Sequence, residues 1–264
     1  MSSAPPSSGP VEVGGWRHWQ GRALVVGCGG IGRALLTALG ERATGLERLG
    51  THRPTTGPMV ASAGSGSPAS VRLLALDLAC DVSLNRLAAD LREGPPLRLV
   101  ICTAGLLHAP DLLPEKRLAQ VKRASLERSF AVNAFGPLLL AQVLEPLLPR
   151  TLPCHFVSLS ARVGSIADNS LGGWYAYRAA KAAQNQLLRT LALEWRRRLP
   201  LACVSLLHPG TTATGLSAPF RGSVPAGQLF TPERAAGHLL DVLEGLTPEH
   251  SGSFWAWDGQ PIPW

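Results

Sequence analysis

The amino-acid sequence predicts an α/β protein: a single doubly wound domain with a parallel sheet of about seven strands and helices on both faces. Short apolar runs of strand length alternate with longer segments of helical periodicity, which is the order of a parallel sheet with crossover helices. The strand-like runs are also almost continuously apolar, as strands covered on both faces are. A chain of 264 residues is long enough to form one large domain around a substantial core.

The predicted elements alternate from residue 22 to residue 257. The first strand, 22–26, is followed by a glycine loop, 27–32, and by a helix, 33–43. The other predicted strands are 46–51, 71–76, 97–102, 154–159, 202–207 and 253–257. The other predicted helices are 81–92, 118–148, a helix that starts near Tyr177, and 232–246. Asp81 is the expected N-cap of its helix, because apolar residues follow it at helical spacing.

The predicted boundaries separate a lead-in, 1–20, from the domain, 21–264. Residues 1–15 are rich in serine, proline and glycine and lack the apolar region of an export signal, so we expect disorder there, with an organellar transit peptide as the alternative. Residues 54–70 are a predicted flexible loop. Residues 216–230 are a candidate substrate lid or, alternatively, a plain surface loop.

Composition excludes some classes of protein. Hydrophobic residues make up 45% of the chain and charged residues 16%, which is typical of a compact protein and not of a disordered one. The net charge is +7, but the arginines are scattered, which favours solvated surface positions over nucleic-acid binding. A basic protein would also suit an anionic cofactor.

The cysteines and the apolar segments predict a cytoplasmic protein without a metal site. The five cysteines are far apart and form no C-x-x-C pair, as expected for reduced, buried thiols. The longest weakly charged stretch, 131–148, is interrupted by Asn133, Gln142 and Glu145, so it is interpreted as a core helix and not as a membrane span.

The most informative pair is Tyr177 and Lys181. They lie four residues apart at the start of a helical apolar pattern, so both side chains are expected on one helix face. A nearby ammonium favours the phenolate, so the pKa of Tyr177 is expected to lie below its ordinary value of about 10. Such a pair could serve as a general acid and base.

The first two strand ends predict a dinucleotide site. Gly27-Cys28-Gly29-Gly30-Ile31-Gly32 connects the first strand to the first helix, where glycines let a pyrophosphate approach the helix N-terminus. The second strand is followed by Thr51-His52-Arg53, with no acidic residue to bind a ribose 2′-hydroxyl. Arg53 instead suits a 2′-phosphate, which favours NADP over NAD. The alternative for Arg53 is a solvated loop residue.

Small or polar residues follow the other strands, at the edge of the sheet where ligands bind in such folds. They are Asp77-Leu78, Thr103-Ala104-Gly105, the segment 158–165, and Pro209-Gly210-Thr211-Thr212-Ala213-Thr214. His108 and His208 are expected to be structural or close to the cofactor.

Together these pieces resemble the short-chain dehydrogenase/reductase superfamily, which has the Rossmann fold, from about residue 23 to the C-terminus. Additional matching motifs are Val132-Asn133-Ala134-Phe135-Gly136 and Tyr177-x-x-x-Lys181. The local sequence around Gly164-Ser165-Ile166 and Gly172-Gly173-Trp174 is most similar to that of the C-factor and sniffer-type carbonyl reductase branch.

The resemblance implies roles for the matching residues. Tyr177 would be the general acid and base, Lys181 would lower its pKa and hold the nicotinamide ribose, and Asn133 would anchor a proton-relay water through a helix irregularity. The cofactor site would comprise Gly27, Gly30, Ile31, Gly32, Arg53, Asp77, Leu78, Ala104, Gly105, Tyr177, Lys181, Pro209, Gly210, Thr212 and Thr214. The substrate would be a small carbonyl compound or alcohol, and the chain would form a homodimer or homotetramer.

The sequence departs from the family at two places. The glycine loop is one residue shorter than usual, and Ala161 occupies the usual position of the catalytic serine. Ser160 or Ser165 would have to supply the hydroxyl, and Ser160 is preferred. The alternative function is a cofactor-binding signalling or regulatory protein with reduced catalysis.

Overall fold

The computed structural model describes residues 15–54, 71–225 and 227–264, and the described chain contains one seven-stranded sheet. All strand pairs are parallel, in the order β3-β2-β1-β4-β5-β6-β7. The strands are β1 (Gly21–Val26), β2 (Leu46–His52), β3 (Arg72–Ala75), β4 (Leu97–Cys102), β5 (Cys154–Leu159), β6 (Ala202–His208) and β7 (Ser253–Ala256). The predicted fold class is therefore confirmed.

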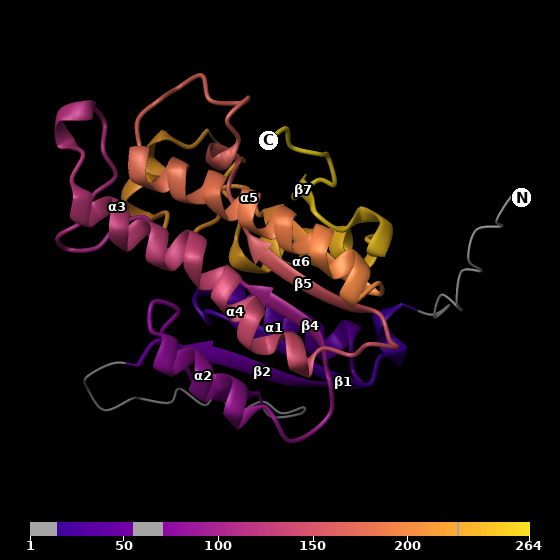
Figure 1. The fold of residues 1–264 in the computed structure, drawn as a ribbon. Coiled ribbons are helices and arrows are strands. Elements are labelled where there is room, and N and C mark those ends of the chain that lie inside the picture. Colours follow the sequence, from indigo (N-terminus) through magenta and orange to yellow (C-terminus); the bar gives the residue numbers. More distant parts are fainter. Residues whose placement is uncertain (1–14, 55–70, 226) are drawn as a thin grey trace, which may run out of the picture.

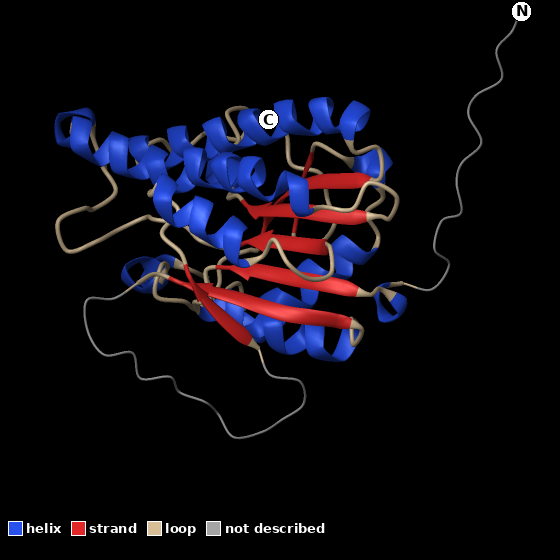
Figure 2. Ribbon diagram, turned by 60° about the horizontal axis from the view of Figure 1, so that its bottom comes forward, coloured by secondary structure: helices blue, strands red, loops and turns tan. Residues whose placement is uncertain are grey.

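Helices cover both faces of this sheet (Figures 1 and 2). They are α1 (Gly30–Arg42), α2 (Asp81–Asp90), α3 (Arg123–Phe130), α4 (Gly136–Leu144), α5 (Tyr175–Arg198) and α6 (Pro232–Glu244). One core layer packs α2, α4 and α5 against the sheet, and a second layer packs α1 and α6 against the opposite face. Every residue of β1, β4 and β5 is buried, which explains why these strands are almost continuously apolar.

The strand order indicates where a ligand would bind. β1 lies between β2 and β4, so the chain leaves β1 in one direction for β2 and returns on the other side for β4. The loops that follow these strands diverge at this point and leave a crevice at the carboxyl edge of the sheet. The glycine loop after β1 opens directly into this crevice.

The long predicted helix is divided in the structure. A 3₁₀ turn, Leu118–Gln120, precedes α3, and a π-helical turn, Ala131–Phe135, separates α3 from α4. The segment from Arg123 to Leu147 is long and apolar enough to cross a membrane by length and composition alone, but it packs against α2 and α5 as a core helix does. A π turn inserts an extra residue into the helical ladder and often marks a functional site.

Several predicted boundaries differ from the structure. α1 begins at Gly30, so the last three residues of the predicted glycine loop, 30–32, form the first turn of this helix. Cys80, and not Asp81, occupies the N-cap position of α2, and Asp81 lies in the first turn, where its charge favours the helix dipole. The predicted loop 54–70, apart from residue 54, and most of the lead-in, 1–14, lie outside the described residues.

Residues before the predicted domain boundary at 21 also pack into the core. A 3₁₀ turn, Trp16–His18, places Trp16 and Trp19 in the core at 4% and 5% exposure. Trp19 stacks on His155 at 5.6 Å between ring centroids, and the Arg98 guanidinium lies 4.2 Å from the centroid of the Trp19 ring. Since Arg98 and His155 stand near the beginnings of β4 and β5, the two indoles close the amino edge of the sheet, opposite the crevice.

Candidate active site

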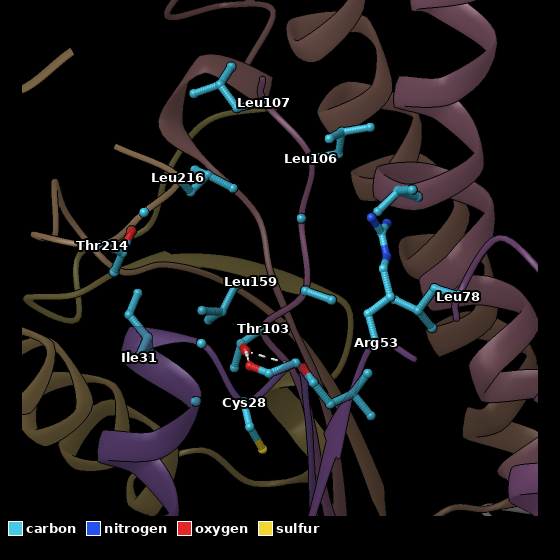
Figure 3. A pocket seen from close by; sticks show the side chains of 18 of the residues that line it. Cys28, Ile31, Arg53, Leu78, Thr103, Leu106, Leu107, Leu159, Thr214 and Leu216 are labelled. Carbon is cyan, nitrogen blue, oxygen red and sulfur yellow. Dashed lines mark hydrogen bonds between the residues drawn. The ribbon is translucent and has the colours of Figure 1, made fainter. Parts of the chain in front are cut away.

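A groove of about 620 Å³ lies at the carboxyl edge of the sheet (Figure 3). Most of the predicted cofactor and catalytic residues line it. Those residues are Gly27, Gly30, Ile31, Gly32, Arg53, Asp77, Leu78, Ala104, Gly105, Ser160, Tyr177, Lys181, Pro209 and Thr214. Three predicted residues, Asn133, Gly210 and Thr212, do not line the groove.

The glycine loop is fixed by two threonine hydroxyls. Thr103 donates to the carbonyl of Gly27 at 2.6 Å, and Thr51 accepts from the amide of Gly27 at 3.0 Å. Gly27 has φ +94°, and a Cβ on Gly32 would overlap the Gly27 carbonyl, so both positions require glycine. No side chain caps the N-terminus of α1, so its first-turn N–H groups face the groove as an anion cradle. The loop therefore fits a pyrophosphate, although it is one residue shorter than usual.

Arg53 follows the last residue of β2 and is exposed at the groove wall, beside Leu78 (Figure 3). Asp77, after β3, accepts a hydrogen bond from the Ala79 amide at 3.0 Å through one carboxylate oxygen. The position that would bind a ribose 2′-hydroxyl thus carries a cation. This charge distribution fits a cofactor with a 2′-phosphate.

Tyr177 and Lys181 occupy the first two turns of α5 and are 8% and 2% exposed. The Lys181 ammonium lies 5.8 Å from the centroid of the Tyr177 ring. It donates hydrogen bonds to the Leu159 carbonyl at 2.8 Å and to Gln184 Oε1 at 3.0 Å. The two side chains therefore share one helix face, as their spacing predicts.

The acid–base properties of the pair differ from the prediction. Burial raises the pKa of the Tyr177 phenol above its ordinary value, so the expected lowering by Lys181 is wrong. Burial also lowers the pKa of Lys181, to about 8, because the charged ammonium is desolvated. The helical spacing could indicate proximity but not the depth at which the pair is buried.

The serine segment brings only one of the two candidate hydroxyls to the groove. Ser160 lines the same groove as Tyr177 but donates its proton to Asn185 Oδ1 at 2.6 Å. Ser165 is buried, accepts a hydrogen bond from the Asp168 amide at 3.1 Å and does not line the groove. Ala161 is the residue that precedes the 3₁₀ turn Arg162–Gly164.

Asn133 lies in the π turn with its side chain fully buried. Its Oδ1 accepts from the Leu106 amide at 2.8 Å, and its Nδ2 donates to the Leu106 carbonyl at 2.7 Å and to Ser129 Oγ at 3.1 Å. The amide thus clamps the loop after β4 in its groove-lining position. Both Nδ2 hydrogens are used in these contacts, and the Asn133 side chain does not line the groove.

Three loops meet above Tyr177 through aromatic side chains. The ring of Trp174 lies 6.3 Å from that of Tyr177 and 5.0 Å from that of Phe220, and His108 lies 6.1 Å from Phe220. His108 Nε2 is also 3.0 Å from the Gly215 carbonyl, which ties the loop after β4 to the loop after β6. Trp174 has φ 52°, a left-handed conformation that costs a bulky residue about 1–2 kcal/mol.

The groove contains residues to which the sequence motifs assigned no individual role. Cys28, Val132 and Leu159 line it as apolar walls, and the hydrogen bonds of Thr51 and Thr103 to the Gly27 backbone were not predicted. The signal for the threonines was present, since each lies at or directly after the end of a predicted strand. Leu216 is the first residue of the candidate lid, 216–230, and it lines the groove from this irregular loop.

Comparison with known proteins agrees with this architecture. The chain is 37% identical over 148 residues to C-signal of Myxococcus xanthus, covering 56% of this chain and 83% of that one. It is 34% identical over 192 residues to 1-hydroxy-2-glutathionyl-2-methyl-3-butene dehydrogenase of Rhodococcus sp. (strain AD45), covering 72% and 78%. The structure of NADPH-bound carbonyl reductase from chicken fatty liver shares the fold, with a TM-score of 0.79, 24% identity and coverage of 93% and 95%.

The family profile described as short chain dehydrogenase matches residues 22–223, which span β1 to the loop after β6. This match includes the glycine loop, the π turn and the Tyr177–Lys181 pair. The resemblance inferred from the sequence motifs is confirmed: the chain is an enzyme of the short-chain dehydrogenase family.

Proposed function

We propose that this chain is an NADP(H)-dependent oxidoreductase that reduces the carbonyl group of a small molecule or oxidises the corresponding alcohol. One observation carries the proposal: Tyr177 and Lys181 line the same groove as a glycine loop and Arg53. Acid–base groups and a nucleotide-phosphate cradle are thereby combined in one crevice. The relatives named as a dehydrogenase and a carbonyl reductase support the same reaction class.

Residues that line the groove would hold each part of the cofactor. The N-terminus of α1 would hold the pyrophosphate, Arg53 the 2′-phosphate, and Asp77 and Leu78 the adenine end. Lys181, Pro209 and Thr214 would hold the nicotinamide end. When bound, NADPH supplies the hydride, and the residues of the chain supply position and the proton.

Tyr177 is suited to donate that proton. The raised pKa keeps the phenol protonated near neutral pH, which is the form that a general acid needs for carbonyl reduction. The phenol would give its proton to the carbonyl oxygen of the substrate, which would leave a phenolate on Tyr177. Lys181, whose pKa is about 8, is largely cationic near neutral pH and would stabilise the phenolate that remains.

Asn133 acts in this proposal as a positioning residue. Its side chain holds Leu106, and Ser129 connects it to the Ala176 carbonyl at 3.2 Å, directly before Tyr177. Both Nδ2 hydrogens of Asn133 are used in these bonds, so a proton-relay water could not accept a hydrogen bond from this side chain. Such a water would instead donate to Oδ1 or contact the backbone of the π turn.

Replacing Tyr177 with phenylalanine tests the proposal. General acid catalysis contributes roughly 10²–10⁴-fold, so kcat for carbonyl reduction should fall by that factor while NADPH binding, followed by its fluorescence, persists. Tyr175→Phe is the matched control, because Tyr175 is 41% exposed and does not line the groove. Wild-type turnover by Tyr177→Phe would refute the assigned role.

The runner-up function is a cofactor-binding signalling or regulatory protein. The observation that favours it is Ala161 at the usual serine position, together with the commitment of the Ser160 hydroxyl to Asn185. A chain that binds NADPH but turns over none of a broad panel of aldehydes, ketones and alcohols would favour this alternative. The cytoplasmic location and the homodimer or homotetramer remain predictions of the same proposal.

A further inference from the structure

Glu115 lies in the loop between β4 and α3 and is only 3% exposed, although its side chain is a carboxylate. It does not line the groove. We infer that Glu115 is a positioning residue for Tyr177: its carboxylate caps the helix that carries the tyrosine and fixes the turn before it. The inference rests on the proposed function for its catalytic consequence, and on the structure alone for the contact itself.

The first argument is the cap of α5. The N-cap residue, Trp174, provides no side-chain hydrogen bond to the first turn of this 24-residue helix. Glu115 supplies it from the neighbouring loop, because its Oε2 accepts from the Ala176 amide at 3.2 Å. A carboxylate also matches the positive end of the helix dipole. Ala176 directly precedes Tyr177, so this bond fixes the backbone at the phenol.

The second argument is the turn that leads into α5. Gly172, Gly173 and Trp174 have φ values of 64°, 66° and 52°, three left-handed residues in succession. The Glu115 carbonyl accepts from the Trp174 amide at 2.5 Å, and a Cβ on Gly173 would meet that carbonyl at 3.3 Å. Glu115 thus binds the turn through its backbone and the helix through its side chain. A tryptophan stays in such a conformation only where its surroundings enforce it.

The third argument is the cost of the arrangement. Glu115 Oε1 is buried and has no hydrogen-bond partner among residues 15–54, 71–225 and 227–264. A buried, half-satisfied carboxylate destabilises a fold, so its presence at the start of the catalytic helix indicates a functional use. Ala176 is also held from the other side, because the Ser129 hydroxyl donates to its carbonyl at 3.2 Å.

The contacts predict a specific kinetic defect. Without the Glu115 carboxylate, the first turn of α5 can fray and the Tyr177 phenol can move relative to the groove. A displacement of about 1 Å can reduce kcat by roughly 10²-fold. The binding of NADPH should be almost unaffected, since Glu115 contacts none of the groove through its side chain.

The experiment compares Glu115→Ala, Glu115→Gln and the control Glu127→Ala, which removes an exposed carboxylate from α3. We expect Glu115→Ala to lower kcat about 10–100-fold with the KM for NADPH within about twofold of wild type. Glu115→Gln keeps an oxygen that can accept from Ala176, so it should restore kcat to within about threefold. Hydrogen exchange measured by mass spectrometry should be faster over residues 175–178 in Glu115→Ala and near wild type in Glu115→Gln.

The exchange measurement keeps the inference separate from the proposed function. If wild type turns over no faster than Tyr177→Phe, the proposed function fails, and exchange at residues 175–178 still decides whether Glu115 holds the turn. Unchanged exchange in Glu115→Ala, or a Glu115→Gln variant as impaired as Glu115→Ala, would overturn the inference. If Glu115→Ala does not fold, Glu115→Asp, whose carboxylate is one methylene shorter, replaces it, and wild-type kcat and exchange in that variant would overturn the inference.

Discussion

Ser160 and Asn185 are joined by a buried hydrogen bond of 2.6 Å in which the serine hydroxyl is the donor. Asn185 lies on α5, eight residues after Tyr177 and one turn after Lys181. The Ser160 hydroxyl therefore points its proton toward the helix that carries the candidate catalytic pair. To bind a substrate oxygen it would have to exchange the Asn185 acceptor for the substrate.

The first prediction concerns this hydroxyl and the neighbouring alanine. If Ser160 serves the substrate oxygen, Ser160→Ala should reduce kcat by about 10²-fold, the usual cost of losing one donor of this kind. Ala161→Ser restores a hydroxyl at the usual family position and should raise kcat, also in the Ser160→Ala background. Ser165→Ala is the control and should stay near wild type, because Ser165 does not line the groove. An unchanged kcat in Ser160→Ala would exclude the residue from catalysis.

The second prediction concerns cofactor choice at the end of β2. A charge-assisted hydrogen bond to a phosphate contributes about 1.5–3 kcal/mol, so Arg53→Ala should raise the KM for NADPH roughly 10–100-fold and leave the KM for NADH unchanged. Arg92→Ala removes another exposed arginine beyond α2 and should change neither constant. Equal effects on NADPH and NADH would show that Arg53 does not recognise the 2′-phosphate.

The third prediction concerns the buried ammonium of Lys181. With a pKa lowered to about 8, the folded chain loses this proton before the unfolded chain does, so the site gains stability as pH rises from about 8 to about 10.5. Lys181→Met lacks this dependence. Urea unfolding at about pH 7 and about pH 9.5 should show wild type gaining stability relative to Lys181→Met.

Lys181→Met should also lower kcat by at least about 10²-fold, because the phenolate loses its cation. The same stability difference between the two proteins at both pH values would contradict the buried cation.

The fourth prediction concerns acid stability and two histidines: His155, at the amino edge of the sheet, and His208, at the carboxyl end of β6. Burial, and the nearby Arg98 charge, lower the pKa of His155 to about 4, and burial lowers that of His208 to about 4. As pH falls from about 6.5 to about 4, the unfolded chain binds protons that the folded chain does not, and each histidine costs about 3 kcal/mol of stability.

His155→Phe keeps an aromatic ring between the two indoles and removes one of these protons. It should lose less stability than wild type between about pH 7 and about pH 4.5 in urea unfolding. His18→Phe changes an exposed histidine and is the control. Parallel losses in wild type and His155→Phe would show that His155 does not cause the acid sensitivity.

The sequence allowed the fold and the main lines of the groove to be predicted, because these depend on local patterns. The alternation of strands and helices, the glycine loop and the Tyr177–Lys181 spacing are all readable within short windows. The family match confirmed the fold-level expectation, while the individual site roles remain proposals. The π turn was not located by periodicity, although the resemblance implied a helix irregularity at Asn133.

The features that escaped prediction depend on contacts between distant segments. Glu115 and Ala176 are 61 residues apart, and nothing near Glu115 in the sequence indicates a helix cap. The direction in which the Tyr177 pKa shifts depends on burial by surrounding elements, which the spacing of Tyr177 and Lys181 does not reveal. The lead-in, 1–20, was predicted from the composition of its first residues, which does not indicate that Trp16 and Trp19 pack into the core.

The two N-terminal indoles have a practical consequence for recombinant work on this enzyme. A truncated chain that begins at Gly21 would lack both rings and would open Arg98 and His155 to water at the end of the sheet farthest from the groove. Such a truncation would be expected to lower the free energy of unfolding without removing any candidate catalytic residue. Affinity tags and cleavage sites are therefore best placed ahead of Gly15, so that Trp16 and Trp19 stay in the expressed protein.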